Sequence, residues 1–182
     1  MFIFGHVGLT ICLLLIALLI LKKNDDIYKL DFRLIAIFAI LPDIIDKSIG
    51  HLIFYDTLNN GRLFCHTLIF LVIFCFIFYL IIGTYWWIYS FPIITHQLFD
   101  RMWEAPNTWL WPGYGFEFKS FDINVWEHWY SALISNPYII STEILGVIVL
   151  LFLFIYFKLY VRNHFICFIK TGRVNPRART TP

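Results

Sequence analysis

The longest apolar stretch of the chain, residues 63–99, contains no Asp, Glu, Lys or Arg. As one continuous helix it would be about 55 Å long at 1.5 Å per residue, whereas the hydrocarbon core of a bilayer is only about 30 Å thick. Gly83-Thr84 is the one turn signal inside the stretch. It therefore predicts a helical hairpin, with residues 63–82 as one full membrane span and residues 85–99 as a weaker return segment.

Composition excludes the common soluble classes. Of the 182 residues, 60% are hydrophobic and 14% are charged, whereas an ordinary soluble domain has roughly a quarter of its residues charged. A soluble enzyme, a disordered regulator and a disulfide scaffold are therefore excluded. The net charge of +2 is too small to indicate a nucleic-acid partner, and none is expected. The four cysteines have no C-x-x-C spacing and lie in or beside apolar runs, which is typical of buried, unreactive thiols.

Three further apolar segments complete the membrane domain. Residues 2–21 and 144–160 are long enough to span, and residues 2–21 lack a basic leader and a cleavage site, so they are expected to be retained. Residues 34–41 form a shorter segment. Pro42 is expected to break that helix, because the residue before a proline avoids the helical region. The expected fold is an all-α membrane protein of about five membrane helices or partial helices.

Basic residues predict the orientation, because they accumulate on the cytoplasmic side. Five segments place the basic residues after the first span on the same side as those after the last. These two groups are Lys22, Lys23, Lys29 and Arg33, and Lys158, Arg162, Lys170, Arg173, Arg177 and Arg179. We expect the N-terminus and the Trp-rich loop of residues 101–142 outside. We expect a membrane domain at residues 1–162 and a basic cytoplasmic tail at 163–182, with residues 172–182 disordered.

With this orientation, the ionisable residues at the ends of the spans all fall near the outer face: His6, Asp43, Asp46, Arg62, His66, His96, Asp100 and Glu143. Two pairs, His96/Asp100 and Arg62/His66, have the i,i+4 spacing of one helix face. Asp43 and Asp46 are i,i+3 in the first turn of a helix that Pro42 would start. The other three histidines have no such neighbours in the sequence.

Imidazole and carboxylate groups in this number indicate a metal site. Zinc takes His nitrogen and Asp or Glu oxygen, and a carboxylate can bridge two ions. Taken singly, such residues are more simply solvated or ion-paired. Together they indicate one or two divalent ions, zinc or alternatively manganese. The candidate ligands are His6, Asp43, Asp46, His66, His96, Asp100 and Glu143, with the choice between Asp43 and Asp46 open. Arg62 and Lys47 are the candidate catalytic cations.

Several short motifs also carry a family resemblance: GH at 5–6, LPDIIDK at 41–47, GRLFCHT at 61–67, HQLFD at 96–100 and WP at 111–112. Over about residues 1–160 the chain resembles the YdjM-like membrane-bound metal-dependent hydrolases, also described as LexA-binding, inner membrane-associated hydrolases. The resemblance implies an inner membrane location and hydrolytic chemistry.

A more distant similarity to zinc-dependent phospholipases C and single-strand nucleases implies a first ion held by His66, His96, Asp100 and one of Asp43 and Asp46. It also implies a second ion held by His6, with Asp100 as the bridging carboxylate. The chain departs from those enzymes in one respect: Glu143 has no histidine four positions before it. A three-metal cluster is therefore not expected.

The function expected is attack of water on a phosphoester at the outer membrane face, with Arg62 and Lys47 neutralising charge on the phosphate. A phospholipid is the favoured substrate, because the tryptophans of the outer loop could line the path of an amphiphile. Their simpler role is to anchor the loop at the membrane interface. Two alternatives are an ion or proton transporter component and a non-catalytic membrane adaptor. Membrane lipid is the expected surrounding, and the sequence predicts no particular protein partner.

Overall fold

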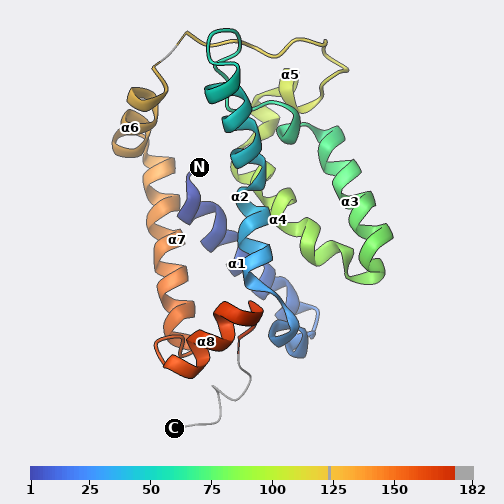
Figure 1. Cartoon of the computed structure of the whole chain (residues 1–182), viewed down its shortest axis with the longest axis vertical. Helices are drawn as coiled ribbons and strands as arrows, with labels where there is room; N and C mark the ends of the chain where they lie inside the picture. Colours follow the sequence, from blue (N-terminus) through green and yellow to red (C-terminus); the bar gives the residue numbers. More distant parts are fainter. Residues whose placement is uncertain (123, 175–182) are drawn as a thin grey trace.

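The structure, a computed structural model, describes residues 1–122 and 124–174, and these residues form helices and connecting turns with no β-strand (Figure 1). The α-helices are α1 (Ile3–Ile20), α2 (Phe32–Ser48), α3 (Leu68–Ile82), α4 (Trp86–Phe99), α5 (Pro106–Trp109), α6 (Val125–Ser135), α7 (Pro137–Tyr156) and α8 (Arg162–Thr171). Short 3₁₀ turns are η1 (Asn24–Lys29), η3 (Phe64–His66), η4 (Gly83–Tyr85) and η5 (Met102–Glu104), and η2 (Ile49–Ile53) is a π-helical turn. The expected all-α membrane class is confirmed.

Within the described residues, three stretches are long and apolar enough to cross a membrane: Ile3–Ile20, Leu68–Phe99 and Pro137–Tyr156. The second of these is the expected hairpin. It turns at Gly83, whose φ of +57° is open to glycine without strain, and α3 and α4 pack side by side (Figure 1). Each arm is about 22 Å long at 1.5 Å per residue, so these two segments are shorter than the bilayer core.

The expectation that Pro42 breaks a helix is wrong. Helix α2 runs without interruption from Phe32 to Ser48, and Pro42 is buried within it. A proline removes one backbone hydrogen bond, here the bond to the carbonyl of Phe38. The packing of α2 against both α1 and α4 outweighs that loss. Asp43 and Asp46 therefore lie near the C-terminal end of α2 rather than in the first turn of a new helix.

Other boundaries also differ from the predictions. Helix α3 begins at Leu68, because residues 63–67 are an irregular loop that contains η3. Arg62 and His66 therefore do not share a helix face. Helix α7 begins at Pro137, seven residues (about two turns) before the predicted span, which started at residue 144. The expected tail begins with helix α8, so residues 163–174 belong to the fold, while residues 175–182 lie outside the described residues.

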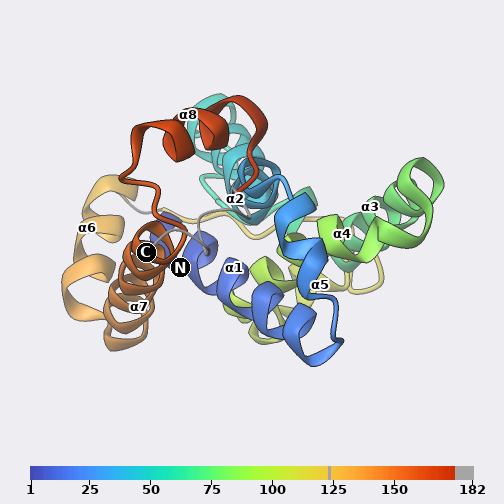
Figure 2. The ribbon, with the colours of Figure 1, turned by 90° about the horizontal axis from the view of Figure 1, so that it is seen from below.

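Helix α1 is central: it packs against α7 on one side and against α2 and α4 on the other (Figure 2). The contact with α7 depends on two glycines, because a Cβ atom on Gly8 would meet the backbone of Gly146, and one on Gly146 would meet the backbone of Phe4. The apolar core lies lower along the bundle and is formed by residues such as Leu14, Leu18, Ile35 and Ile88. Close helix packing thus holds the N-terminal end of α1 in place.

The described residues of the two basic groups lie at the same end of the bundle, as expected, while Arg177 and Arg179 lie outside the described residues. At this end of the bundle the Arg33 Nη1 atom donates to the carbonyl of Ile169 at 2.7 Å, and the backbone N–H of Phe32 donates to Gly172 at 2.9 Å. These bonds join the start of α2 to α8, at the bottom of Figure 1. The opposite end of the bundle carries the residues predicted to face outward.

Replacing Gly146 tests the helix contact. We expect Gly146→Val to lower the free energy of unfolding by about 1–3 kcal/mol, because the added methyl groups must push α1 away from α7. Leu145→Val is the matched control, since Leu145 is 51% exposed on the same helix. Thermal unfolding in detergent measures both. Equal melting temperatures for the two variants would contradict the close packing.

Cysteine labelling tests which end faces the cytoplasm. In a chain whose four native cysteines are alanine, we expect an impermeant maleimide to label Glu117→Cys in sealed spheroplasts but to label Arg173→Cys only after lysis. The physical reason is the concentration of Lys and Arg at the α8 end. The opposite labelling pattern would invert the orientation.

Candidate metal centre

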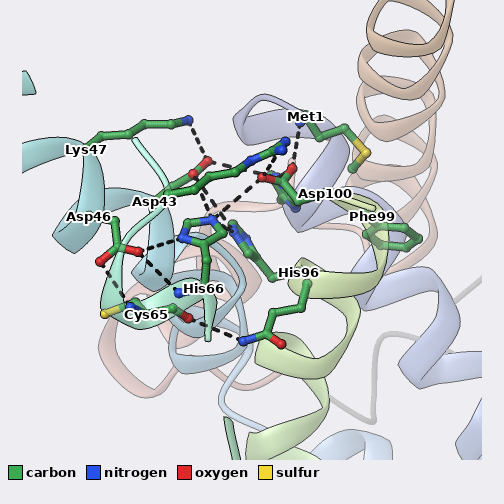
Figure 3. Close-up of polar contacts among 12 residues, drawn as sticks. Met1, Asp43, Asp46, Lys47, Cys65, His66, His96, Phe99 and Asp100 are labelled. Carbon is green, nitrogen blue, oxygen red and sulfur yellow. Dashed lines mark hydrogen bonds and ion pairs between the residues drawn. The ribbon is translucent and has the colours of Figure 1, made fainter. Parts of the chain in front are cut away.

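Four buried side chains meet at the upper end of the bundle: Asp43 of α2, His66 of η3, His96 of α4, and Asp100, which follows α4. One donor atom from each lies within 4.8 Å of the others (Figure 3). Two imidazole nitrogens and two carboxylate oxygens are a donor set that suits a divalent metal ion such as zinc. The cluster could hold one metal ion.

The ring of His66 is held by Asp46. The Nδ1–H group of His66 donates to Oδ2 of Asp46 at 2.7 Å, because an ionised carboxylate can only accept. Asp46 also accepts backbone N–H bonds from Leu63, Cys65 and His66, at 2.7, 3.1 and 3.2 Å. It therefore shapes the loop and turns Nε2 of His66 toward the centre. Partners of this kind orient metal-binding histidines in many proteins.

The ring of His96 is held in the same way by a backbone carbonyl. Its Nδ1–H donates to the oxygen of Ala39 at 2.7 Å, and its Nε2 atom lies 3.2 Å from Nε2 of His66. With Nδ1 of each ring committed to its donor bond, the neutral forms of the two rings would present lone pairs to each other. Two lone pairs this close repel unless a proton or a cation lies beside them, so the arrangement fits a bound cation.

The carboxylates complete the group. Oδ1 of Asp43 is buried and has no hydrogen-bond partner in the described part of the chain, and it lies 3.7 Å from Nε2 of His66 and 3.9 Å from Nε2 of His96. Oδ2 of Asp100 lies 3.6 Å from Nε2 of His66. An orphaned carboxylate oxygen is costly in a buried site. A metal ion would satisfy it, so the residues present fit such an ion.

His6 joins the edge of this group. Its ring stacks on His96 with centroids 4.1 Å apart, and its Nε2 atom lies 3.2 Å from Oδ1 of Asp100 and 4.0 Å from Oδ2 of Asp43. The side chain is fully buried, and neither ring nitrogen has a hydrogen bond of good geometry within the described residues. His6 thus lies at the edge of the cluster, next to Asp100.

Two cations lie at the rim. Nζ of Lys47 donates to Oδ2 of Asp43 at 2.7 Å, and Nη2 of Arg62 lies 3.4 Å from Oδ2 of Asp100. Each cation thus faces a carboxylate of the cluster from the solvent side, since the Lys47 side chain is 28% exposed and that of Arg62 is 42% exposed. The α-amino group of Met1 also contacts Asp100, at 2.8 Å from Oδ1.

The electrostatics of the site favour a cation. Burial raises the pKa of Asp100, but the adjacent His6 and His66 rings and the Met1 α-amino group outweigh it and hold that pKa well below the ordinary value. Burial likewise lowers the pKa of His66, but the Asp100, Asp46 and Asp43 carboxylates beside it leave that pKa raised. Burial and the nearby Asp46 carboxylate raise the pKa of Cys65 to about 12. Cys65 therefore stays a neutral thiol and is a poor ligand and nucleophile.

The structure separates the predicted ligands into three groups. Asp43, His66, His96 and Asp100 converge, with His6 beside them, whereas Asp46 lies behind His66. Glu143 lies elsewhere: its carboxylate accepts backbone N–H bonds from Phe2, Phe4 and Gly5 at 2.9, 3.1 and 3.1 Å. Glu143 therefore caps the first turn of α1, where free N–H groups attract negative charge.

A cavity of about 340 Å³ opens above the cluster, and its wall includes Asp43, Asp100, Lys47 and Arg62. His51 and His128 also line it, although neither was predicted as a site residue. One signal was available for His51: it follows Asp43 and Lys47 at successive i+4 steps. His128 comes from α6, and only the tertiary fold brings it to this wall.

Comparison with known proteins supplies the family. The chain has no match among curated proteins or solved structures. A family model, YdjM inner membrane protein, matches residues 1–165, which include every residue of the cluster. The motifs at 41–47, 61–67 and 96–100, on which the resemblance is based, contain the four residues of the cluster. The chain belongs to the YdjM inner membrane protein family.

Proposed function

We propose that this protein is a membrane-bound, metal-dependent hydrolase that attacks a phosphoester with water at the outer face of the membrane. The observation that carries the proposal is the pair of Nδ1-anchored histidines whose Nε2 atoms lie 3.2 Å apart beside two buried carboxylates. Such a centre gains nothing from burial unless a cation satisfies it. Its open cavity makes it accessible to a substrate.

Asp43, His66, His96 and Asp100 would hold the metal, zinc or alternatively manganese. A bound divalent ion lowers the pKa of water and polarises a phosphoryl oxygen. Water is the expected nucleophile because Cys65 is held as a thiol and the sequence has no G-x-S-x-G motif. His6 and Asp100 are the proposed ligands of a second ion.

Lys47 and Arg62 are the proposed catalytic cations. Both line the cavity, and both sit on its accessible side, opposite the buried histidines. A phosphate group entering the cavity would meet Nζ of Lys47 and the planar guanidinium of Arg62 before it reached the cluster. These cations would orient the phosphate and stabilise the negative charge that develops on its oxygens.

A transporter is less well supported. A conduction path needs ionisable groups through the depth of the membrane, whereas residues 7–20, 68–82 and 144–157 contain no Asp, Glu, Lys, Arg or His. A purely structural adaptor likewise gives no reason for orphaned polar atoms on His6 and Asp43. Hydrolysis is the function that uses both the cluster and the rim cations.

Metal content and activity test the proposal together. We expect the purified wild type to contain close to stoichiometric zinc or manganese and to hydrolyse a phosphoester, and His66→Ala and Asp100→Ala to lose both. His164→Ala is the control, since His164 lies on α8 at the far end of the bundle. Elemental analysis and phosphate release are the measurements. Unchanged metal content in both variants would refute the site.

The two aspartates of α2 should behave differently. We expect Asp43→Asn to lose the bound ion, because it removes a ligand charge. Asp46→Asn should weaken binding by only about 10–100-fold, because Asp46 acts by orienting His66. Asp56→Asn, at an exposed position, is the control. Zinc titration against a chelating dye measures all three. A greater loss in Asp46→Asn than in Asp43→Asn, with both variants folded, would reverse the assignment.

A further inference from the structure

Beside the cavity above the metal cluster lies a second cavity of about 440 Å³, between the end of α2, η2 and α6. Three residues, Lys47, His51 and Trp129, line both cavities. The remaining wall of the second cavity is largely apolar or aromatic, with Leu52, Tyr55, Val125 and Trp126. The two cavities thus adjoin at these three side chains, and together they are called the groove here. The first, called the polar cavity, carries Asp43, Asp100 and Arg62, whereas these charged residues are not in the lining of the second, called the aromatic cavity.

We infer that this groove binds a long-chain phosphoester, with its phosphate at the metal cluster and its hydrocarbon chain in the aromatic cavity. The inference rests on the proposed function and names the substrate class of the same site. It selects an amphiphile from the phosphoesters that the cluster alone would accept. It also assigns a binding role to Tyr55 and Trp126, which lie away from the cluster.

The order of side chains along one segment carries the inference. Asp43, Lys47, His51 and Tyr55 follow one another at four-residue steps from the end of α2 through the π-helical turn η2. Asp43 lines only the polar cavity, Lys47 and His51 line both cavities, and Tyr55 lines only the aromatic cavity. Polarity therefore falls steadily in the direction in which a phosphoester passes from its phosphate to its chain.

The junction between the cavities is held in a fixed arrangement. Nδ1 of His51 and Oδ1 of Asn59 are 3.0 Å apart, and the His51 ring meets Trp129 edge-on with centroids 5.6 Å apart. Nζ of Lys47 lies 5.6 Å from the Trp129 ring centre. Gly61 faces this junction, and a Cβ atom there would come within 2.8 Å of Nε2 of His51. The glycine thus leaves room for the two polar side chains at the junction.

Charge decides which end of the substrate enters which cavity. A tryptophan-lined cavity can also bind a quaternary ammonium group by cation–π attraction. Here Lys47 already occupies that position at Trp129, so a second cation would be repelled. Lys47 and Arg62 instead attract the phosphate, and Leu52, Val125 and Trp126 offer the apolar contact that a hydrocarbon chain needs. An anionic head with an apolar chain is the complementary ligand.

Chain-length selectivity tests the inference. In nanodiscs, we expect the full-length wild type to hydrolyse a dodecyl phosphoester with at least about tenfold higher kcat/KM than the methyl homologue, because only the longer chain fills the aromatic cavity. In Trp126→Ser and Tyr55→Ser, kcat/KM for the dodecyl ester should fall toward the value for the methyl ester, so that most of this preference is lost. Tyr130→Ser is the matched control, since Tyr130 is 67% exposed on α6 and lines neither cavity.

A binding measurement separates failure of this inference from failure of the proposed function. We expect dodecylphosphonate brominated at the chain end, which is not hydrolysed, to quench tryptophan fluorescence more in the wild type than in Trp126→Phe. If neither ester is hydrolysed but this difference is seen, the groove stands and the proposed function fails. If both esters are hydrolysed with equal kcat/KM, the groove assignment is overturned and hydrolysis stands. If quenching is the same in Trp126→Phe, the groove assignment is overturned whether or not the esters are hydrolysed.

Discussion

The positions of the residues around the cluster depend on two imidazole rings, those of His66 and His96, which bring their Nε2 atoms together inside a membrane protein. Asp46 and the carbonyl of Ala39 hold the rings of His66 and His96 by their Nδ1–H groups, which leaves both Nε2 atoms 3.2 Å apart. Neither ring can turn away without breaking a buried hydrogen bond, which is costly. The close approach of the two nitrogens is therefore built into the fold, and a proton or a metal ion beside them would relieve the repulsion between their lone pairs.

The rest of the bundle keeps these groups in register. The His66 ring comes from a loop and the His96 ring from α4, and Asp46 connects the loop to α2 through its backbone N–H bonds. His6 reaches the same place because α1 packs against α7 through Gly8 and Gly146. Glu143 of α7 adds to this by capping the first turn of α1. Glu143, which was predicted as a metal ligand, thus positions α1, the helix that carries His6.

The sequence could predict which residues lie close together, but not which of them belong to the cluster and which orient or support it. Helix direction alternates from span to span, so basic residues at one end imply that His66, His96 and Asp100 share the other. That reasoning uses only chain direction and cannot distinguish Asp43 from Asp46, which are three residues apart. Helix α2 continues through Pro42, which a local rule about proline forbids and tertiary packing permits. Within it, Asp43 lies in the cluster, whereas Asp46 accepts hydrogen bonds from the loop of residues 63–66. His128 had no local signal because only the fold brings α6 to the cavity.

The same continuation of α2 links the cluster to the groove. Asp43 and Lys47 share one face of α2 at a spacing of four residues, and His51 follows four residues later in η2. Because the helix continues and then widens into the π-helical turn η2, one segment carries a carboxylate, an ammonium, an imidazole and a phenol in order. Turns of this type occur often at functional sites. Pro42, at which the local rule about proline fails, therefore lies in the segment that connects the metal cluster to the aromatic cavity.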